Sequence, residues 1–168
     1  MFEIIAFDGR TVIDHAQRGA RLRRQDHIGT EHLLLGLAQA NGVAKRAIVA
    51  AGISDVMIGN AIDATVRIGS RPSPDRLRLA PTTSGILAQA QKEAERLGDD
   101  AVHTEHILLS LLKQKRCVAL RVLDSLDISQ AYLKRMLVGV MDGFTGQGAK
   151  ELADFRRCQT RERRKETA

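Results

Sequence analysis

Hydrophobic positions along the chain recur at helical spacing, and the pattern that they form occurs twice. The ten residues Ile28–Leu37, IGTEHLLLGL, return as Val102–Leu111, VHTEHILLSL, at an offset of 74 residues without a gap. Upstream, Val12 pairs with Ile86 at the same offset, and downstream Gly52-Ile53-Ser54 pairs with Asp127-Ile128-Ser129 at an offset of 75. A fixed period of this kind is the signature of a repeated structural unit. The chain is therefore predicted to be a tandem duplication.

Each unit is predicted to contain four helices, because apolar residues three and four positions apart fall on one helix face. In the first unit the helices cover about 10–24, begin at Thr30, cover about 43–51 and begin after Ser54; in the second they cover about 83–97, begin at Thr104, cover about 117–125 and begin after Ser129. The two helices that begin at threonine are apolar almost all round, so we expect them to be buried, with each hydroxyl capping its own first turn. Gly98 stands where a left-handed residue ends a helix. The predicted fold class is all-α.

Segments of different composition join and follow the two units. The first unit is expected over about 1–68, a linker containing the run GSRPSP over 69–80, and the second unit over about 81–144. Residues 145–168 carry seven Lys or Arg against four Asp or Glu and have little that a core could bury, so a flexible basic tail is expected. The sequence thus predicts one double domain over 1–144 and a tail.

Composition narrows the class of protein further. Four Phe, one Tyr and no Trp leave Ala, Leu, Ile and Val to fill the core, which favours close helix packing over sheets. No window approaches the ~18 uninterrupted apolar residues of a membrane span, and the N-terminus lacks the pattern of a secretory signal. Cys117 and Cys158 are too few and too far apart for a disulfide framework or a zinc cage. We therefore expect a protein of the reducing cytoplasm, without membrane contact.

The doubled Thr-Glu-His motif, each followed by a Leu-rich helix, together with the opening Met1-Phe2 and the pair Ala16-Gln17, resembles the double Clp N-terminal domain, and in particular that of ClpC-type AAA+ unfoldases. The resemblance covers residues 1 to about 143. It implies a pseudo-twofold bundle of eight helices that binds adaptor and substrate proteins of a Clp protease system. The sequence has no Gly-x-x-x-x-Gly-Lys-[Ser/Thr] phosphate loop, so we expect a free-standing binding module, acting as an adaptor, competitor or decoy, and not an enzyme.

Two acidic residues are the main candidates for binding. Glu31 and Glu105 follow the threonines Thr30 and Thr104 in the first turns of their helices, where the helix dipole favours a carboxylate. On residue type alone, ordinary N-terminal acids are the favoured interpretation of both. The resemblance implies that each receives the guanidinium of phosphoarginine on tagged substrates, because both match the family's Thr-Glu-His glutamates.

Other positions of that family pocket have changed. Ala6 and Ala80 stand where the family has threonine, and Ser84 stands where it has lysine. These are the groups that would hold a phosphate. We therefore expect the acids to bind another cationic or peptide ligand.

The resemblance also places Phe2 and Leu79 in an apolar groove for adaptors and for cyclic-peptide ligands. A phenylalanine at residue 2 serves equally well to pack the start of the first helix. Leu79 replaces an aromatic residue that is common in the family, so weaker stacking of a ligand is expected there. The expected partners are peptides, adaptors and substrate proteins, and the expected state is a monomer.

The remaining polar residues suggest no catalysis. His32 and His106 have no second ligand at metal-binding spacing, so each is expected to close a local hydrogen bond, and no metal or cofactor is expected. His15, His27 and His103 are taken as isolated, and Cys117 as a small hydrophobe at a helix start. A second class of function, association with nucleic acid through the arginines of the tail, remains open, although charge runs are usually solvated. Deleting residues 145–168 would separate this class from peptide binding.

Overall fold

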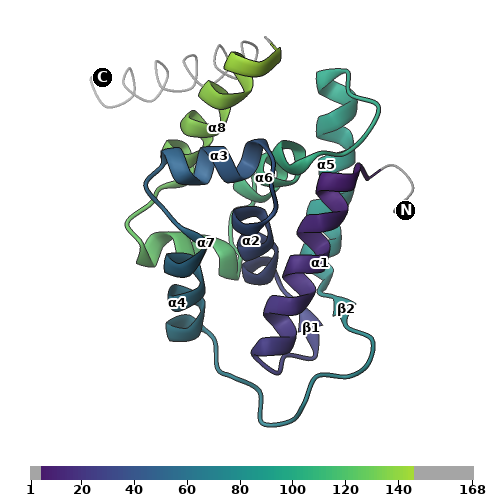
Figure 1. The fold of residues 1–168 in the computed structure, drawn as a ribbon, viewed down its shortest axis with the longest axis vertical. Helices are drawn as coiled ribbons and strands as arrows, with labels where there is room; N and C mark the ends of the chain where they lie inside the picture. The colour runs from purple at the N-terminus through teal and green to yellow at the C-terminus, as the bar shows by residue number, and fades with distance from the viewer. Residues whose placement is uncertain (1–4, 146–168) are drawn as a thin grey trace.

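In the computed structural model, residues 5–145 are described, and they fold into helices with one short pair of strands (Figure 1). The elements of the first repeat are α1 (Phe7–Leu22), β1 (His27–Ile28), α2 (Thr30–Gln39), α3 (Val43–Ala50) and α4 (Asp55–Thr65). Those of the second repeat are β2 (Arg78–Leu79), α5 (Pro81–Leu97), α6 (Thr104–Leu112), α7 (Val118–Ser125) and α8 (Gln130–Thr145). The all-α prediction with four helices in each repeat is confirmed.

The helix ends follow the sequence signals with small shifts. The Ser54 and Ser129 hydroxyls accept hydrogen bonds from the amides of Met57 (3.2 Å) and Tyr132 (3.1 Å), as expected of N-caps. Gly98 ends α5 with a φ of 81°, the left-handed conformation that suits glycine. The first helix starts at Phe7, three residues before the predicted residue 10, and Asp8 lies in its first turn, where the helix dipole favours an acid.

The two leucine-rich helices form the centre of the bundle. Leu33, Leu34 and Leu37 of α2 are fully buried, and so are Leu108 and Leu111 of α6. Figure 1 shows α2 and α6 in the interior, with the other helices around them. A helix that is apolar all round has to be enclosed on all sides. The prediction that these helices are buried is confirmed.

The two repeats are interleaved and do not pack as separate halves. Within each repeat, α1 packs on α2 and α5 packs on α6. Between the repeats, α3 of the first packs on α8 of the second, and α4 packs on α7. Residues at equivalent positions of the two repeats therefore build one common core. One repeat alone could not enclose this core.

The threonine hydroxyls connect the repeats, which corrects the prediction that they cap their own helices. The N-caps of α2 and α6 are Gly29 and His103. The Thr104 hydroxyl accepts from the amide of Ala44 in α3 (3.2 Å), and the Thr30 hydroxyl accepts from the amide of Ala119 in α7 (3.1 Å). Each threonine thus satisfies a free amide at the start of a helix in the other repeat.

The segment predicted as a linker is anchored to the first repeat. Its end forms β2, which pairs in parallel with β1 in the register His27 to Arg78 and Ile28 to Leu79. Its middle is held by Arg21, whose guanidinium donates to the carbonyls of Pro74 (3.0 Å) and Asp75 (2.6 Å). This segment therefore also fixes the start of α5 beside α2.

In the described part of the chain, no single helix is long and apolar enough to cross a membrane. Only α3 and α4 taken together reach such a length and composition, and they meet at an angle of 80°. The tail predicted over 145–168 lies outside the described residues from residue 146 onward.

Candidate functional site

Two junctions between the repeats collect most of the predicted binding residues. At the first junction, β1 and the start of α2 lie beside β2 and the start of α5, and the amide of Ala80 donates to the carbonyl of Ile28 (3.0 Å). At the second junction, Ile5 pairs in parallel with Val102, and the amide of Ala6 donates to the Val102 carbonyl (3.0 Å). Each junction therefore brings the N-terminal ends of two helices together, α2 with α5 and α6 with α1.

The predicted binding residues divide between these two places. Thr30, Glu31 and Leu79 belong to the first junction, whereas Thr104 and Glu105 belong to the second. Leu79 is half-buried and packs against the apolar cluster of Ala16, Ala20 and Ile28. Phe2 lies outside the described residues. The threonine hydroxyls are committed to the amides of the opposite repeat, so they support the site and are not open to a ligand.

The two glutamates have different environments. Glu31 is 3% exposed, and its carboxylate fills the place where a side chain on Gly29 would begin, 2.5 Å from that position. Burial raises the pKa of the Glu31 carboxyl above its ordinary value, and its own backbone N–H, His27 and Arg23 oppose this only in part. Glu105 is half-buried and lies next to the Thr104 hydroxyl (3.4 Å). Glu105 is therefore the more accessible carboxylate.

Sequence reasoning missed the neighbours of Glu105. Asp8, in the first turn of α1, places one oxygen 3.0 Å from His103 Nδ1 and the other 3.5 Å from the amide of Thr104. His103, taken as isolated from its sequence, is thus paired across the repeats. Asp8 could have been suspected as a first-turn acid, but its partner is 95 residues away, and no local pattern shows this contact.

The second junction has one carboxylate more than the first, and Arg10, at the position equivalent to Ser84, adds a basic group whose Nε donates to the Ile5 carbonyl (3.2 Å). This second junction carries Asp8 and Glu105, whereas Thr82 and Glu31 stand at the equivalent positions of the first junction. Two carboxylates beside a half-exposed histidine suit a guanidinium or an ammonium group, which carboxylates bind by charge-assisted hydrogen bonds. Asp8 Oδ2 lies 3.5 Å from the Thr104 amide at the start of α6, so a phosphate could take this amide only by displacing the carboxylate.

The two buried histidines close local hydrogen bonds, as expected. His32 Nδ1 accepts from the amide of Gly29 (3.0 Å), and His106 Nδ1 accepts from the amide of His103 (2.9 Å). The second ring nitrogen differs, because His106 Nε2 lies 2.8 Å from Asp99 Oδ2, whereas His32 Nε2 is buried without a partner. Among the residues that the structure describes, no group of three or more His, Cys, Asp or Glu is arranged to hold a metal ion.

Comparison with known proteins supports the fold and extends it to a family. The sequence model of the Clp repeat (R) N-terminal domain matches residues 9–126. The negative regulator of genetic competence ClpC/MecB of Bacillus subtilis is 33% identical over 130 residues, which cover 77% of this chain and 16% of that protein. The chaperone protein ClpB of Oceanobacillus iheyensis is 28% identical over 152 residues, covering 90% of this chain and 19% of that protein. The chain thus spans a fifth or less of the length of these relatives.

Solved structures show the same fold. The N-terminal domain of the chaperone ClpD from Arabidopsis thaliana aligns with a TM-score of 0.70 at 20% identity, covering 84% of this chain and 99% of that one. The Hsp104 N-terminal domain from Candida albicans aligns with a TM-score of 0.67 at 20% identity, covering 81% of this chain and 90% of that one. At this level of identity the likeness concerns the fold alone.

Proposed function

The chain belongs to the Clp repeat (R) N-terminal domain family, and from this premise we propose that it is a docking module that binds cationic peptide segments without acting on them chemically. The observation that carries the proposal is the second junction, where Asp8 contacts His103 and the amide of Thr104, and half-buried Glu105 lies beside the hydroxyl of the same threonine. A basic side chain of a peptide can pair there with two carboxylates.

The arrangement favours an arginine over a phosphoarginine. Ala6 and Ala80 begin α1 and α5 without a hydroxyl, and Ser84 offers no ammonium group. The Asp8 carboxylate adds a negative charge where a phosphate would have to lie. At the second junction, the missing hydroxyl at Ala6 and the carboxylate of Asp8 both favour an unphosphorylated arginine, whereas Arg10, at the position equivalent to Ser84, acts in the opposite direction.

Peptide binding tests this proposal directly. Two fluorescein-labelled peptides, identical except for arginine or phosphoarginine, are titrated with the full chain, and fluorescence anisotropy gives the two Kd values. We expect the arginine peptide to bind at least as tightly as the phosphoarginine peptide. Glu105→Gln should weaken arginine binding about 10-fold or more, since a hydrogen bond to a charged group contributes about 1.5–3 kcal/mol.

Matched variants make the test specific to the junctions. Glu31→Gln should have a smaller effect, because the Glu31 carboxylate is buried. Glu95→Gln is the control, because Glu95 is an exposed acid on α5 whose carboxylate only accepts from Gln91. Binding that requires the phosphate, or that is unchanged in the Glu31→Gln/Glu105→Gln double variant, would contradict the proposal.

We also propose that the chain shares docking partners with full-length Clp unfoldases, because it is homologous to their docking domains. Adding the chain to a degradation assay with ClpC, ClpP and an adaptor-dependent substrate separates the possible roles. Inhibition indicates a competitor or decoy, and stimulation indicates an adaptor. An unchanged rate at a large molar excess of the chain would argue against shared partners.

A further inference from the structure

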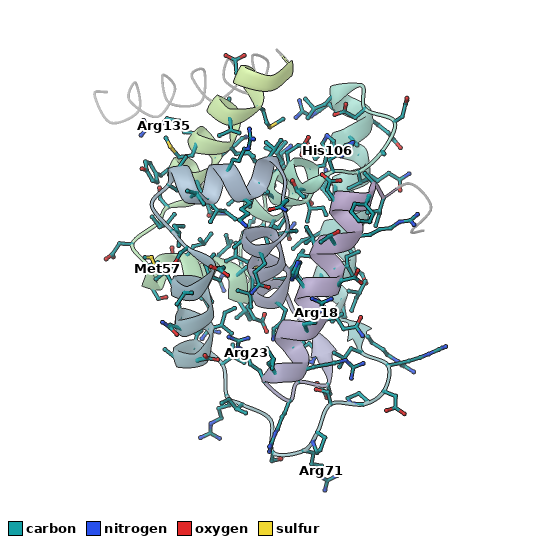
Figure 2. All side chains as sticks on the ribbon, viewed as in Figure 1. Arg18, Arg23, Met57, Arg71, His106 and Arg135 are labelled. Atoms are coloured by element: carbon teal, nitrogen blue, oxygen red, sulfur yellow. The ribbon has the colours of Figure 1, made fainter. Side chains whose placement is uncertain are left out.

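A groove on the first repeat, formed by α1, α2 and α4, shares no residue with the two junctions. Its volume is about 420 Å³, which lies within the range of pockets that bind ligands. Arg18 and Leu22 of α1 form one wall, Leu35 of α2 lies at the bottom, and Asp55 and Val56 of α4 form the other wall. Figure 2 shows Arg18 on α1 and Arg23 where α1 approaches α4.

In the second repeat, side chains occupy the corresponding space. Four groove positions are replaced there by residues that form one hydrogen-bonded cluster; these are Gln89, Glu93, Arg96 and Lys113, at the positions of His15, Gly19, Leu22 and Gln39. Glu93 is 2% exposed, and its carboxylate accepts from Lys113, from Arg96 (3.0 and 3.1 Å) and from Gln89 (3.3 Å). The first repeat has a glycine in place of this carboxylate, so its space is open.

The open groove has a fixed shape. Arg23 crosses its floor and donates to the Gly19 carbonyl of α1 (3.1 Å), to the Gly59 carbonyl of α4 (3.2 Å) and to the Asp63 carboxylate (2.8 Å). A Cβ on Gly19 would lie 3.0 Å from the Leu35 side chain. Arg23 thus links α1 and α4 by hydrogen bonds at the base of the groove. Gly19 has no side chain that would fill the groove from α1.

Both exposed apolar side chains and unpaired charged side chains face the opening of the groove. Leu22 is 81% exposed and Val56 is 65% exposed, on opposite walls. Within the described residues, the side chains of Arg18 and Asp55 make no hydrogen bond or ion pair. His15, Gln39, Asn60 and Asp63 also line the groove, so it combines three apolar side chains with several polar ones.

We propose that this groove binds a short segment of a partner protein in which aliphatic side chains are flanked by an acidic residue on the α1 side and a basic residue on the α4 side. The aliphatic side chains would cover Leu22, Leu35 and Val56. The acid pairs with Arg18 and the base with Asp55, which matches the opposite charges of the two walls. The α1 wall from His15 to Leu22 is about 10 Å long, so three or four extended residues fill it.

A peptide selection followed by titration tests this inference. A random heptapeptide library displayed on phage is selected on the full chain, and the enriched peptide is synthesised with fluorescein as the probe. We expect enriched sequences to combine aliphatic residues with one acid and one base. Failure to enrich such sequences would overturn the proposal.

The site of binding is then tested by filling the groove. The variant Gly19→Glu/Leu22→Arg/Gln39→Lys introduces the cluster of the second repeat, and we expect the Kd of the probe to rise at least 10-fold. Arg18→Glu, at an exposed position that does not threaten folding, should weaken binding to a similar extent. Lys92→Glu, the matched charge reversal at the same position of α5, should leave the Kd within twofold.

A charge exchange gives the sharpest result. A probe in which the acid is replaced by lysine should bind Arg18→Glu more tightly than it binds the wild type, because the ion pair is restored in reverse. Equal binding of the original probe to wild type and to Arg18→Glu would overturn the assignment to this groove, even if the triple variant failed to fold.

Discussion

The two repeats share their backbone connections but differ in how they treat buried polar groups. Both use a threonine hydroxyl to satisfy a helix-start amide of the opposite repeat, and both use a histidine Nδ1 to accept an amide at the start of the central helix. In the second repeat the histidine has a second partner, Asp99, and Glu93 has three donors. In the first repeat, Gln25 stands at the position of Asp99 and donates to the carbonyl of Arg67 (2.7 Å), which leaves His32 Nε2 unpaired.

This difference shows which contacts the duplicated fold requires. The contacts present in both repeats hold backbone amides, whose burial without an acceptor is costly. The side-chain networks present in only one repeat can be lost while the helices stay in place. The first repeat lacks such a network; it has an open groove and two buried titratable groups in unfavourable surroundings, Glu31 and His32.

The largest expected effect tests the shared core. Leu34→Ala and Leu108→Ala should each lower the free energy of unfolding by about 2–5 kcal/mol, because both side chains are fully buried at equivalent positions. Urea denaturation followed by circular dichroism measures both. The comparison predicts losses of similar size in the two variants, within the spread of about 2 kcal/mol that buried Leu→Ala changes show. A loss confined to one variant would mean that the two central helices are not equivalent.

The next effect tests the network found only in the second repeat. Lys113→Ala removes a donor to the buried Glu93 carboxylate and should cost about 2 kcal/mol, within the range for hydrogen bonds to charged groups. Gln39→Ala, at the equivalent position of the first repeat, should change stability by less than about 0.5 kcal/mol. Equal losses in the two variants would contradict the proposed difference between the repeats.

Acid titration of the same variant gives an independent measurement. Burial acts to raise the pKa of Glu93, but the bonds from Lys113, Gln89 and Arg96 outweigh it and hold this pKa below its ordinary value. A depressed carboxyl pKa stabilises the fold above the unfolded-state value of 4.5, and this contribution is lost as the pH falls further. The acid-induced loss of stability should therefore be smaller in Lys113→Ala than in the wild type.

The sequence was sufficient for the local part of this structure. Apolar spacing placed the eight helices, the serines marked two helix starts, and Gly98 marked a left-handed end. These signals act within a few residues, so they can be read along the chain.

The contacts that build the candidate site could not be predicted in the same way. The Thr30 hydroxyl reaches an amide 89 residues away, and Asp8 reaches a histidine 95 residues away. Both contacts depend on how the repeats interleave, which the helix pattern of either repeat does not determine. The groove could not be predicted for a related reason. The first repeat has Gly19 where the second has Glu93, and this difference leaves an open space only because α4 forms the second wall.

A pH-dependent effect of intermediate size tests the unpaired histidine. Burial, with Arg23 and His27 nearby, lowers the pKa of His32 to about 4 from an ordinary value of 6.5. The neutral ring is therefore favoured in the folded state, so stability is complete above pH 6.5 and falls as the pH drops toward 4. Between pH 7 and pH 5 the loss from this group should be about 1–2 kcal/mol.

His32→Gln isolates this contribution. Glutamine keeps an acceptor for the Gly29 amide, as in a capping box, but does not titrate. The difference in unfolding free energy between wild type and variant should change with pH, and because the Glu31 carboxylate lies 3.5 Å from His32 Nδ1, a Glu31→Gln background is used to remove the titration of that acid. His106→Gln is the matched variant in the second repeat. A pH-independent difference for His32→Gln would contradict the assignment.

The smallest expected effect concerns the crossed threonine bonds, where the repeats should behave alike. Thr30→Val and Thr104→Val each leave one helix-start amide without its acceptor and should cost about 1 kcal/mol, whereas Thr→Ser at the same sites should cost less because the hydroxyl remains. The Thr104 side chain packs closely against the start of α3. A Cβ on Gly42 would lie only 2.5 Å from the Thr104 hydroxyl oxygen, so there is no room for a side chain at residue 42.

Hydrogen exchange distinguishes a crossed bond from an ordinary helix cap. Thr30→Val should speed exchange of the Ala119 amide in the second repeat and leave the Ala44 amide protected, and Thr104→Val should do the reverse. Faster exchange confined to the amides of α2 in Thr30→Val would instead mean that the hydroxyl caps its own helix. The predicted pattern requires each repeat to hold the third helix of the other, so neither can keep that helix in place alone.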